Sequence, residues 1–243
     1  MTASISPAAA SAERQMITLP IAEGLTCFRG LSPKRSRFEL EYALERGSTA
    51  NSFLFAAGAD TAGVPQPAVL VHPPGAAYAS VFLPALHQAL PDPASKLVVV
   101  VGHVNPNRVA LLRDLASAYS ALELVASNAG AKLLRELWSL RRPQAPGDES
   151  PQPPLPDLPE IKIIRQEQTL PVSHGHQLHV LPTPTPRWPG GLLAFEETLG
   201  LLMSDKLFSA HICTSEWAEW NRSETEEERR HFYDCLMAPM ASQ

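Results

Sequence analysis

Apolar residues in the first half of the chain gather in short segments that end at glycine, proline or serine. Residues 51–55 (NSFLF) and 68–72 (AVLVH) have the length and composition of strands. Residues 96–103 (KLVVVVGH) form a continuous apolar run rich in β-branched side chains. Such a run predicts a strand that is covered on both faces.

A helix is predicted directly after this strand, over residues 107–120. Asn105 suits the N-cap, and Pro106 suits the first helical position, where its missing N–H costs nothing. The spacing of the apolar residues predicts one buried stripe. Its members are Val109, Leu112, Leu115, Ala116 and Tyr119.

The pattern continues with a strand at 122–127, a helix at 129–140 and strands at 161–166 and 176–181. Residues 191–204 resemble a hairpin that turns near 196–200, and a last helix is predicted within 223–237. Strands followed by a strand–loop–helix unit and further strands indicate an α/β layered domain. We expect its chemistry at the carboxyl end of the central strand.

Composition fits one folded domain. The chain has 243 residues, 44% hydrophobic and 19% charged, which is the balance of a globular protein. Its net charge of −5 argues against a nucleic-acid partner. No apolar run approaches the roughly 18 residues of a membrane span. Three cysteines without C-x-x-C spacing favour a reducing compartment.

Two segments are predicted to lie outside the core. Residues 1–20 begin with small and polar residues, and we expect a flexible N-terminus with the domain running from 21 to 243. Residues 142–159 are rich in proline, which can neither continue a helix nor donate within a sheet. We expect an exposed insertion there.

The candidate chemistry lies in GHVNPNR, residues 102–108. A strand that ends in H-x-acid-x-acid-H and enters a helix is the metal loop of the metallo-β-lactamase-like αββα fold, where anionic oxygens and neutral nitrogens hold iron or zinc. Residues 183–213 resemble the flavodiiron pattern P-x-x-H-W-P-D followed by L-F-S-x-D-A-F-G-x-H. Residues 29–55 and 228–239 are also similar to the photosynthetic, diflavin branch of that family.

This resemblance extends from about Ile21 to the end of the chain. It implies a metallo-β-lactamase-like αββα sandwich that is truncated at its C-terminus, without the family's flavodoxin-like and flavin reductase domains. Members of the family use di-iron, FMN and FAD to reduce oxygen to water, which protects photosynthetic electron transport. A cyanobacterial cytosol, near the thylakoid, or a chloroplast stroma is the implied location.

The residues at the family's ligand positions differ from the pattern. The positions are His103, Asn105, Asn107, Arg108, Arg187 and Lys206. Only His103 keeps a ligand, amides or cations replace the rest, and the family's last ligand would lie beyond Gln243. Fixed cations would repel a dication, so we expect no di-iron centre and no cofactor in this chain. Asp205 is not expected to substitute, because on an extended segment it would face away from Lys206.

The function implied by the resemblance is that of a partner subunit, inactive as an isolated chain, in a homo- or hetero-oligomer with another flavodiiron subunit. His211 and Trp188 are expected to pack behind the site. Two alternatives stay open. One is a mononuclear metallohydrolase that uses His103 with the histidines of HGHQLH, which are His174, His176 and His179. The other is an anion-binding regulatory module built on Arg187 and Lys206.

Overall fold

Two β-sheets pack face to face in the computed structural model, which describes residues 14–38, 42–141, 154–216 and 223–241. The larger sheet has seven strands in the order β1-β2-β5-β8-β9-β10-β11. These strands are β1 (Gln15–Ala22), β2 (Leu25–Ser32), β5 (Ser48–Phe55), β8 (Ala68–Val71), β9 (Leu97–Val100), β10 (Leu122–Ser127) and β11 (Glu160–Ile164). Its β1, β2, β5 and β8 are antiparallel neighbours, whereas β8 to β11 run parallel.

The smaller sheet is antiparallel and has the order β12-β13-β14-β15. Its strands are β12 (Gln168–Leu170), β13 (Leu178–Pro182), β14 (Leu192–Glu196) and β15 (Leu201–Met203). Two short pairs complete the strands, namely β3 (Arg37–Phe38) with β4 (Tyr42–Ala43), and β6 (Gly58–Ala59) with β7 (Pro65–Gln66). The predicted hairpin of β14 and β15, with its turn after Glu196, is confirmed.

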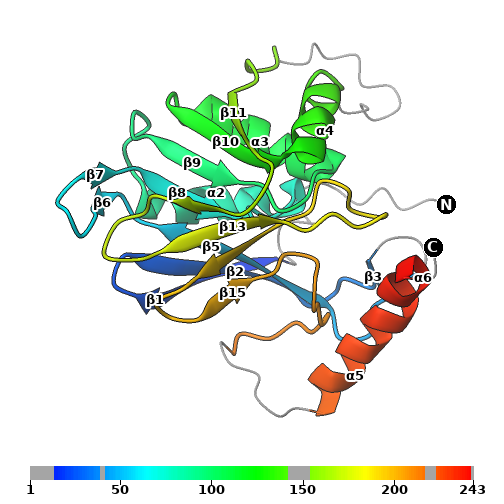
Figure 1. Cartoon of the computed structure of the whole chain (residues 1–243). Coiled ribbons are helices and arrows are strands. Elements are labelled where there is room, and N and C mark those ends of the chain that lie inside the picture. The colour runs from blue at the N-terminus through cyan, green and yellow to red at the C-terminus, as the bar shows by residue number, and fades with distance from the viewer. Residues whose placement is uncertain (1–13, 39–41, 142–153, 217–222, 242–243) are drawn as a thin grey trace.

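Helices cover the outer face of the larger sheet (Figure 1). They are the 3₁₀ turn η1 (Ala76–Tyr78), α2 (Ala79–Ala89), α3 (Pro106–Ala118) and α4 (Asn128–Trp138). The C-terminal segment continues from α5 (Ser223–Phe232) through a π-helical turn, η2 (Tyr233–Met237), into α6 (Ala238–Ala241). This layering agrees with the predicted α/β sandwich. No helix in the described part of the chain is long and apolar enough to cross a bilayer.

Strand β9 shows why its sequence is apolar at every position. Leu97 and Val99 join the hydrophobic cluster under the helices, whereas Val98 and Val100 join the cluster between the two sheets. Successive side chains of a strand point to opposite faces, so both faces of this strand need apolar residues. The prediction of a strand buried on both faces is confirmed.

Helix α3 begins as the sequence predicts. The Asn105 side chain accepts a hydrogen bond from the backbone N–H of Arg108 at 2.8 Å, and Pro106 occupies the first helical position. Its buried surface is wider than the predicted stripe, because Leu111 and Arg113 are also buried. The helix is therefore buried over more of its circumference than one apolar stripe would predict.

The expected flexible N-terminus is wrong for residues 15–20. They form most of β1, which pairs with β2 from Gln15 opposite Leu31 onward. The side chains of this strand alternate, with Met16 packed under the helices and Leu19 between the sheets. Residues 1–13 lie outside the described chain, as do residues 142–153 of the predicted insertion.

The C-terminal helix α5 packs on a third hydrophobic cluster rather than on either main core. Phe232 and Leu236 are both buried there, as their spacing predicts. Trp188 stacks on Phe232 with ring centroids 6.3 Å apart and an interplanar angle of 2°. The cluster also contains Tyr42, whose hydroxyl donates to the buried Glu228 of α5 at 3.3 Å.

Candidate functional site

The candidate site lies where β8 and β9 end beside the loop that follows β15. His72 comes directly after β8, and His103 comes shortly after β9. Because these strands are parallel neighbours, their carboxyl ends meet at one edge of the sheet. The backbone N–H of Leu192 donates to the carbonyl of Gly102 at 2.8 Å, which joins the smaller sheet to this edge. Asp205 reaches the same place from the smaller sheet.

Asp205 is the centre of the polar network at this edge. Its Oδ2 lies 2.6 Å from Nδ1 of His103, and its Oδ1 accepts from Nη1 of Arg108 at 3.2 Å. All three side chains are less than 10% exposed. Burial opposes ionisation of Asp205, but His103 and Arg108 hold the pKa of its carboxyl well below the ordinary value. The carboxylate is therefore a buried anion shared by two partners.

His103 uses both ring nitrogens in this network. Burial, with the charges of Arg108 and Lys206, lowers its pKa to about 3, so the imidazole is neutral at pH 7. Nδ1–H donates to Asp205, and Nε2 lies 3.1 Å from Nδ2 of Asn105. The Asn105 carbonyl oxygen is already used as the cap of α3, which directs its amide nitrogen to His103. Nε2 therefore accepts a hydrogen bond.

The structure corrects the expectation for Asp205. Residues 205–208 form a turn instead of an extended segment, and Asp205 has a φ of 52°. Aspartate tolerates this left-handed conformation better than most residues. The argument from strand alternation does not apply to a turn, so Asp205 enters the site that it was predicted to avoid.

Lys206 lies on the other side of the same turn, toward the aromatic cluster. Its ammonium nitrogen is 4.3 Å from the ring centroid of Phe38, within the range of a cation–π contact. His211 also packs on Phe38, with centroids 4.5 Å apart, and on Tyr42 at 5.1 Å. Burial and the positive charge of Lys206 lower the pKa of His211 to about 3.

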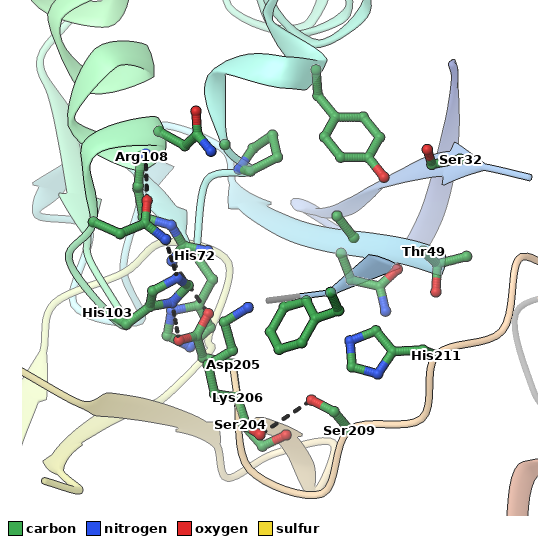
Figure 2. A pocket seen from close by; sticks show the side chains of 18 of the residues that line it. Ser32, Thr49, His72, His103, Arg108, Ser204, Asp205, Lys206, Ser209 and His211 are labelled. Carbon is green, nitrogen blue, oxygen red and sulfur yellow. Dashed lines mark hydrogen bonds and ion pairs between the residues drawn. The ribbon is translucent and has the colours of Figure 1, made fainter. Parts of the chain in front are cut away.

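His103, Asp205, Lys206 and His211 line a cavity of about 830 Å³ (Figure 2). Figure 2 shows His103, Asp205 and Lys206 on one side, with Ser32 and Thr49 across from them. The lining contains four cationic side chains and one carboxylate. They are Arg14, Arg35, Arg108, Lys206 and Asp205. Asn105 and Asn107 also line the cavity.

Arg187 does not line the cavity. The loop between β13 and β14 turns at Thr185, whose side chain accepts from the backbone N–H of Trp188 at 3.0 Å. Trp188 is buried against Phe232, as a packing residue is expected to be, whereas Arg187 is only half-buried. The predicted convergence of Arg187 and Lys206 on one pocket is therefore wrong for Arg187.

The three histidines of residues 174–179 lie at the far end of the smaller sheet. His176 contacts Glu196 at 3.2 Å, at the end of β14, whereas the candidate site adjoins the start of that strand. His179 contacts Glu197 at 3.0 Å, and His174 lies in a turn with φ of 57°. The structure does not bring these side chains to His103. Within the described residues, no group of three or more His, Cys, Asp or Glu side chains is arranged to hold a metal.

His72 is a site residue that the sequence analysis did not single out. It is 3% exposed, its Nε2 lies 2.9 Å from the carbonyl oxygen of Met203, and its Nδ1 has no hydrogen-bond partner among the described residues. The sequence could have indicated His72, because it follows an apolar strand as His103 does. Burial lowers the pKa of His72, which keeps it neutral beside Asp205.

Sequence relatives are diflavin flavoproteins of cyanobacteria, although no family model matches the chain. Diflavin flavoprotein A 6 of Nostoc sp. is 37% identical over 230 residues, which cover 95% of this chain and 36% of that protein. Diflavin flavoprotein A 3 of Synechocystis sp. is 34% identical over 224 residues, which cover 92% of this chain and 34% of that protein. The chain thus spans about a third of the length of these relatives.

Solved structures agree with the sequence relatives. The metal-soaked flavodiiron core of Synechocystis sp. superposes with a TM-score of 0.77 at 33% identity, covering 94% of this chain and 51% of that one. A fragment of diflavin flavoprotein A 5 of Nostoc sp. gives a TM-score of 0.75 at 32% identity, and the superposition covers 95% of this chain and 81% of that fragment. The flavodiiron protein of Giardia intestinalis, 18% identical with a TM-score of 0.72, shares the fold.

Proposed function

Because the chain belongs to the diflavin flavoprotein branch of the flavodiiron proteins and has their metallo-β-lactamase-like fold, we propose that it is a variant subunit in which an internal ion pair occupies the position of the metal centre. The single observation that carries this proposal is the position of Asp205. Its carboxylate bridges His103 and Arg108 at 2.6 and 3.2 Å.

The donor atoms present do not fit a di-iron centre. A histidine ligand needs a ring nitrogen with a free lone pair, but Nε2 of His103 accepts from Asn105 and Nδ1 carries the proton donated to Asp205. Asn105 and Asn107 offer neutral amides where hard cations favour carboxylates. Asp205 is the remaining anion of the cavity lining, and Arg108 already neutralises it.

Charge opposes a metal at the same position. Arg108 and Lys206 both line the cavity beside His103. At a separation of about 5 Å and an effective dielectric of about 20, each cation would repel a dication by several kcal/mol. One carboxylate cannot offset two such cations, so the cavity favours anions over metal ions.

This arrangement supports a role as a partner of another flavodiiron subunit, in a homo- or hetero-oligomer. In the family, oxygen is reduced to water at di-iron with electrons from FMN, and a subunit without iron would leave that step to its partner. Phe208 and Leu202 at the cavity are 73% and 44% exposed, which suits a surface that another protein covers. The isolated chain is proposed to have no oxygen reductase activity.

The metal content of the purified chain tests the first part of the proposal. After expression in medium supplemented with iron and zinc, elemental analysis is expected to find less than about a tenth of an equivalent of either metal. One or two equivalents of tightly held metal would overturn the proposal. Arg108→His combined with Lys206→Asp replaces both cations by metal ligands, and a gain of metal in that variant would show that these two positions exclude it.

The proposed association with another flavodiiron subunit is tested separately. Mixing the chain with a flavodiiron subunit that carries iron should give a complex on size-exclusion chromatography, and Phe208→Asp should weaken it. Phe208 is 73% exposed, and its side chain takes no part in the hydrogen bonds of Asp205 with His103 and Arg108. A chain that stays monomeric alone and in the mixture would contradict the partner role without affecting the metal result.

A further inference from the structure

The cavity has a second polar wall, across from the His103–Asp205 ion pair. Ser32 at the end of β2 lies on this side in Figure 2. Tyr78 of η1 also lines the cavity and packs over Gly30 of the same strand, on the face that carries Ser32. We propose that this wall is a binding subsite for the phosphate group of a small organic phosphate. The proposal goes beyond the role as a partner subunit and does not depend on whether the chain binds metal.

The hydroxyl of Tyr78 is the strongest indication of a ligand. Tyr78 is 5% exposed, and its buried hydroxyl has no hydrogen-bond partner among the described residues. A buried hydroxyl without a partner is unfavourable, because it has lost its hydrogen bonds to water. A bound molecule that supplies an acceptor would recover this free energy. The ring is tightly held, because a Cβ on Gly30 would lie 2.8 Å from its Cε1 atom.

The neighbours of Tyr78 have the chemistry of a phosphate site. The hydroxyl of Ser32 can donate to a phosphate oxygen, as can that of Tyr78. The Arg14 guanidinium lies over the Tyr78 ring, 5.6 Å from its centroid, and lines the same cavity. Guanidinium groups bind phosphate through charge-assisted hydrogen bonds, so this wall combines two hydroxyl donors, from Tyr78 and Ser32, with a positive charge.

The charge of the whole cavity favours an anion. Four cationic side chains and one carboxylate line it, although the chain as a whole carries −5. Asp205 is paired with Arg108 and His103, so it does not offset the charge of Arg14 across the cavity. A concave site of one sign concentrates ions of the other sign.

The size and apolar lining indicate an organic phosphate rather than the free ion. The volume of about 830 Å³ falls within the range of small-molecule sites, roughly 300–1,000 Å³. Phe38 and Phe53 are among the lining residues. A free phosphate ion would occupy only the polar wall, whereas an aromatic phosphate ester would also contact the apolar part of the lining.

Thermal unfolding of the full chain tests the subsite, with inorganic phosphate and phenyl phosphate as probes at constant pH and ionic strength. A ligand that binds the folded state raises its melting temperature in a saturable way. We expect both probes to do so, phenyl phosphate at about tenfold lower concentration. Tyr78→Phe should raise the apparent Kd of both probes about tenfold. It should not lower the melting temperature without ligand, because it removes an unsatisfied hydroxyl.

Tyr119→Phe is the matched control. The Tyr119 hydroxyl is also buried but donates to the carbonyl of Leu90 at 3.1 Å, away from the cavity, so this variant should bind both probes like the parent. No saturable shift in the parent, or equal responses of the parent and Tyr78→Phe, would overturn the proposal. So would loss of binding in Lys206→Ala but not in Tyr78→Phe, which would place the anion at the ion-pair side. Equal affinity for the two probes would overturn the choice of an organic phosphate.

Discussion

The Oδ2 atom of Asp205 lies 2.6 Å from Nδ1 of His103, across 102 positions of sequence. His103 follows β9 of the larger sheet, and Asp205 follows β15, the last strand of the smaller sheet. The contact therefore links the two sheets at the candidate site. Because Arg108 shares the same carboxylate, the link is electrostatically balanced without a metal ion.

Removal of the central carboxylate should destabilise the fold. Asp205→Asn leaves the buried Arg108 guanidinium without its anion, and breaking a buried ion pair from one side costs about 3–5 kcal/mol. Urea denaturation should show a loss of about 3 kcal/mol in the free energy of unfolding. Glu226→Gln, which breaks the exposed pair with Arg230, is the control and should change stability by less than about 0.5 kcal/mol. Equal effects would contradict the central role of Asp205.

The buried His211 should make stability depend on pH. Its folded-state pKa is lowered to about 3, below the value of about 6.5 in an unfolded chain. Between these values the unfolded state binds more protons, so stability falls as the pH falls. His211→Phe should reduce the slope of unfolding free energy against pH by about 1.4 kcal/mol per unit between pH 6 and 4. An unchanged slope, measured by urea denaturation at several pH values, would contradict a neutral buried imidazole.

Glu228 should hold α5 on the domain. It is 6% exposed and accepts hydrogen bonds from Tyr42 at 3.3 Å and Arg46 at 3.0 Å. Glu228→Ala leaves the buried Tyr42 hydroxyl without its acceptor, and we expect a loss of about 2 kcal/mol with faster proteolysis of α5. Glu227 contacts the same arginine at 3.1 Å but is 65% exposed, so Glu227→Ala should cost less than about 0.5 kcal/mol. Similar proteolysis of both variants would exclude this docking role.

Local sequence patterns were enough to predict the strand and the helix on either side of the site. The apolar run before His103 and the Asn105–Pro106 pair specify a buried strand and the start of a helix, because burial on both faces and N-capping depend on neighbouring residues. Resemblance to a family supplied the ligand positions. Both kinds of information place His103 at the cavity, where the structure has it.

The partners of His103 were harder to predict, because they depend on backbone conformations that apolar patterns do not report. Asp205 and His72 both have positive φ, 52° and 55°, which strand and helix periodicity cannot reveal. Arg187 was placed at the pocket by family spacing alone, but packing of the adjacent Trp188 on Phe232 decides how that loop lies. Long-range packing therefore determined which cation enters the cavity.

Gly102 is the residue on which the close packing of the site depends. A Cβ at this position would lie 2.4 Å from Nδ1 of His72 and 2.7 Å from Cγ of Asp205, closer than real contacts allow. Gly102→Ala should therefore displace His72 or Asp205, at a cost of about 1–3 kcal/mol in unfolding free energy. Gly75→Ala is the matched control at the same cavity, because its Cβ would meet Asn107 at an ordinary 3.5 Å. If the two alanine variants unfold at the same urea concentration, the ion pair tolerates movement, and Asp205 cannot be the rigid link between the sheets that its contacts indicate.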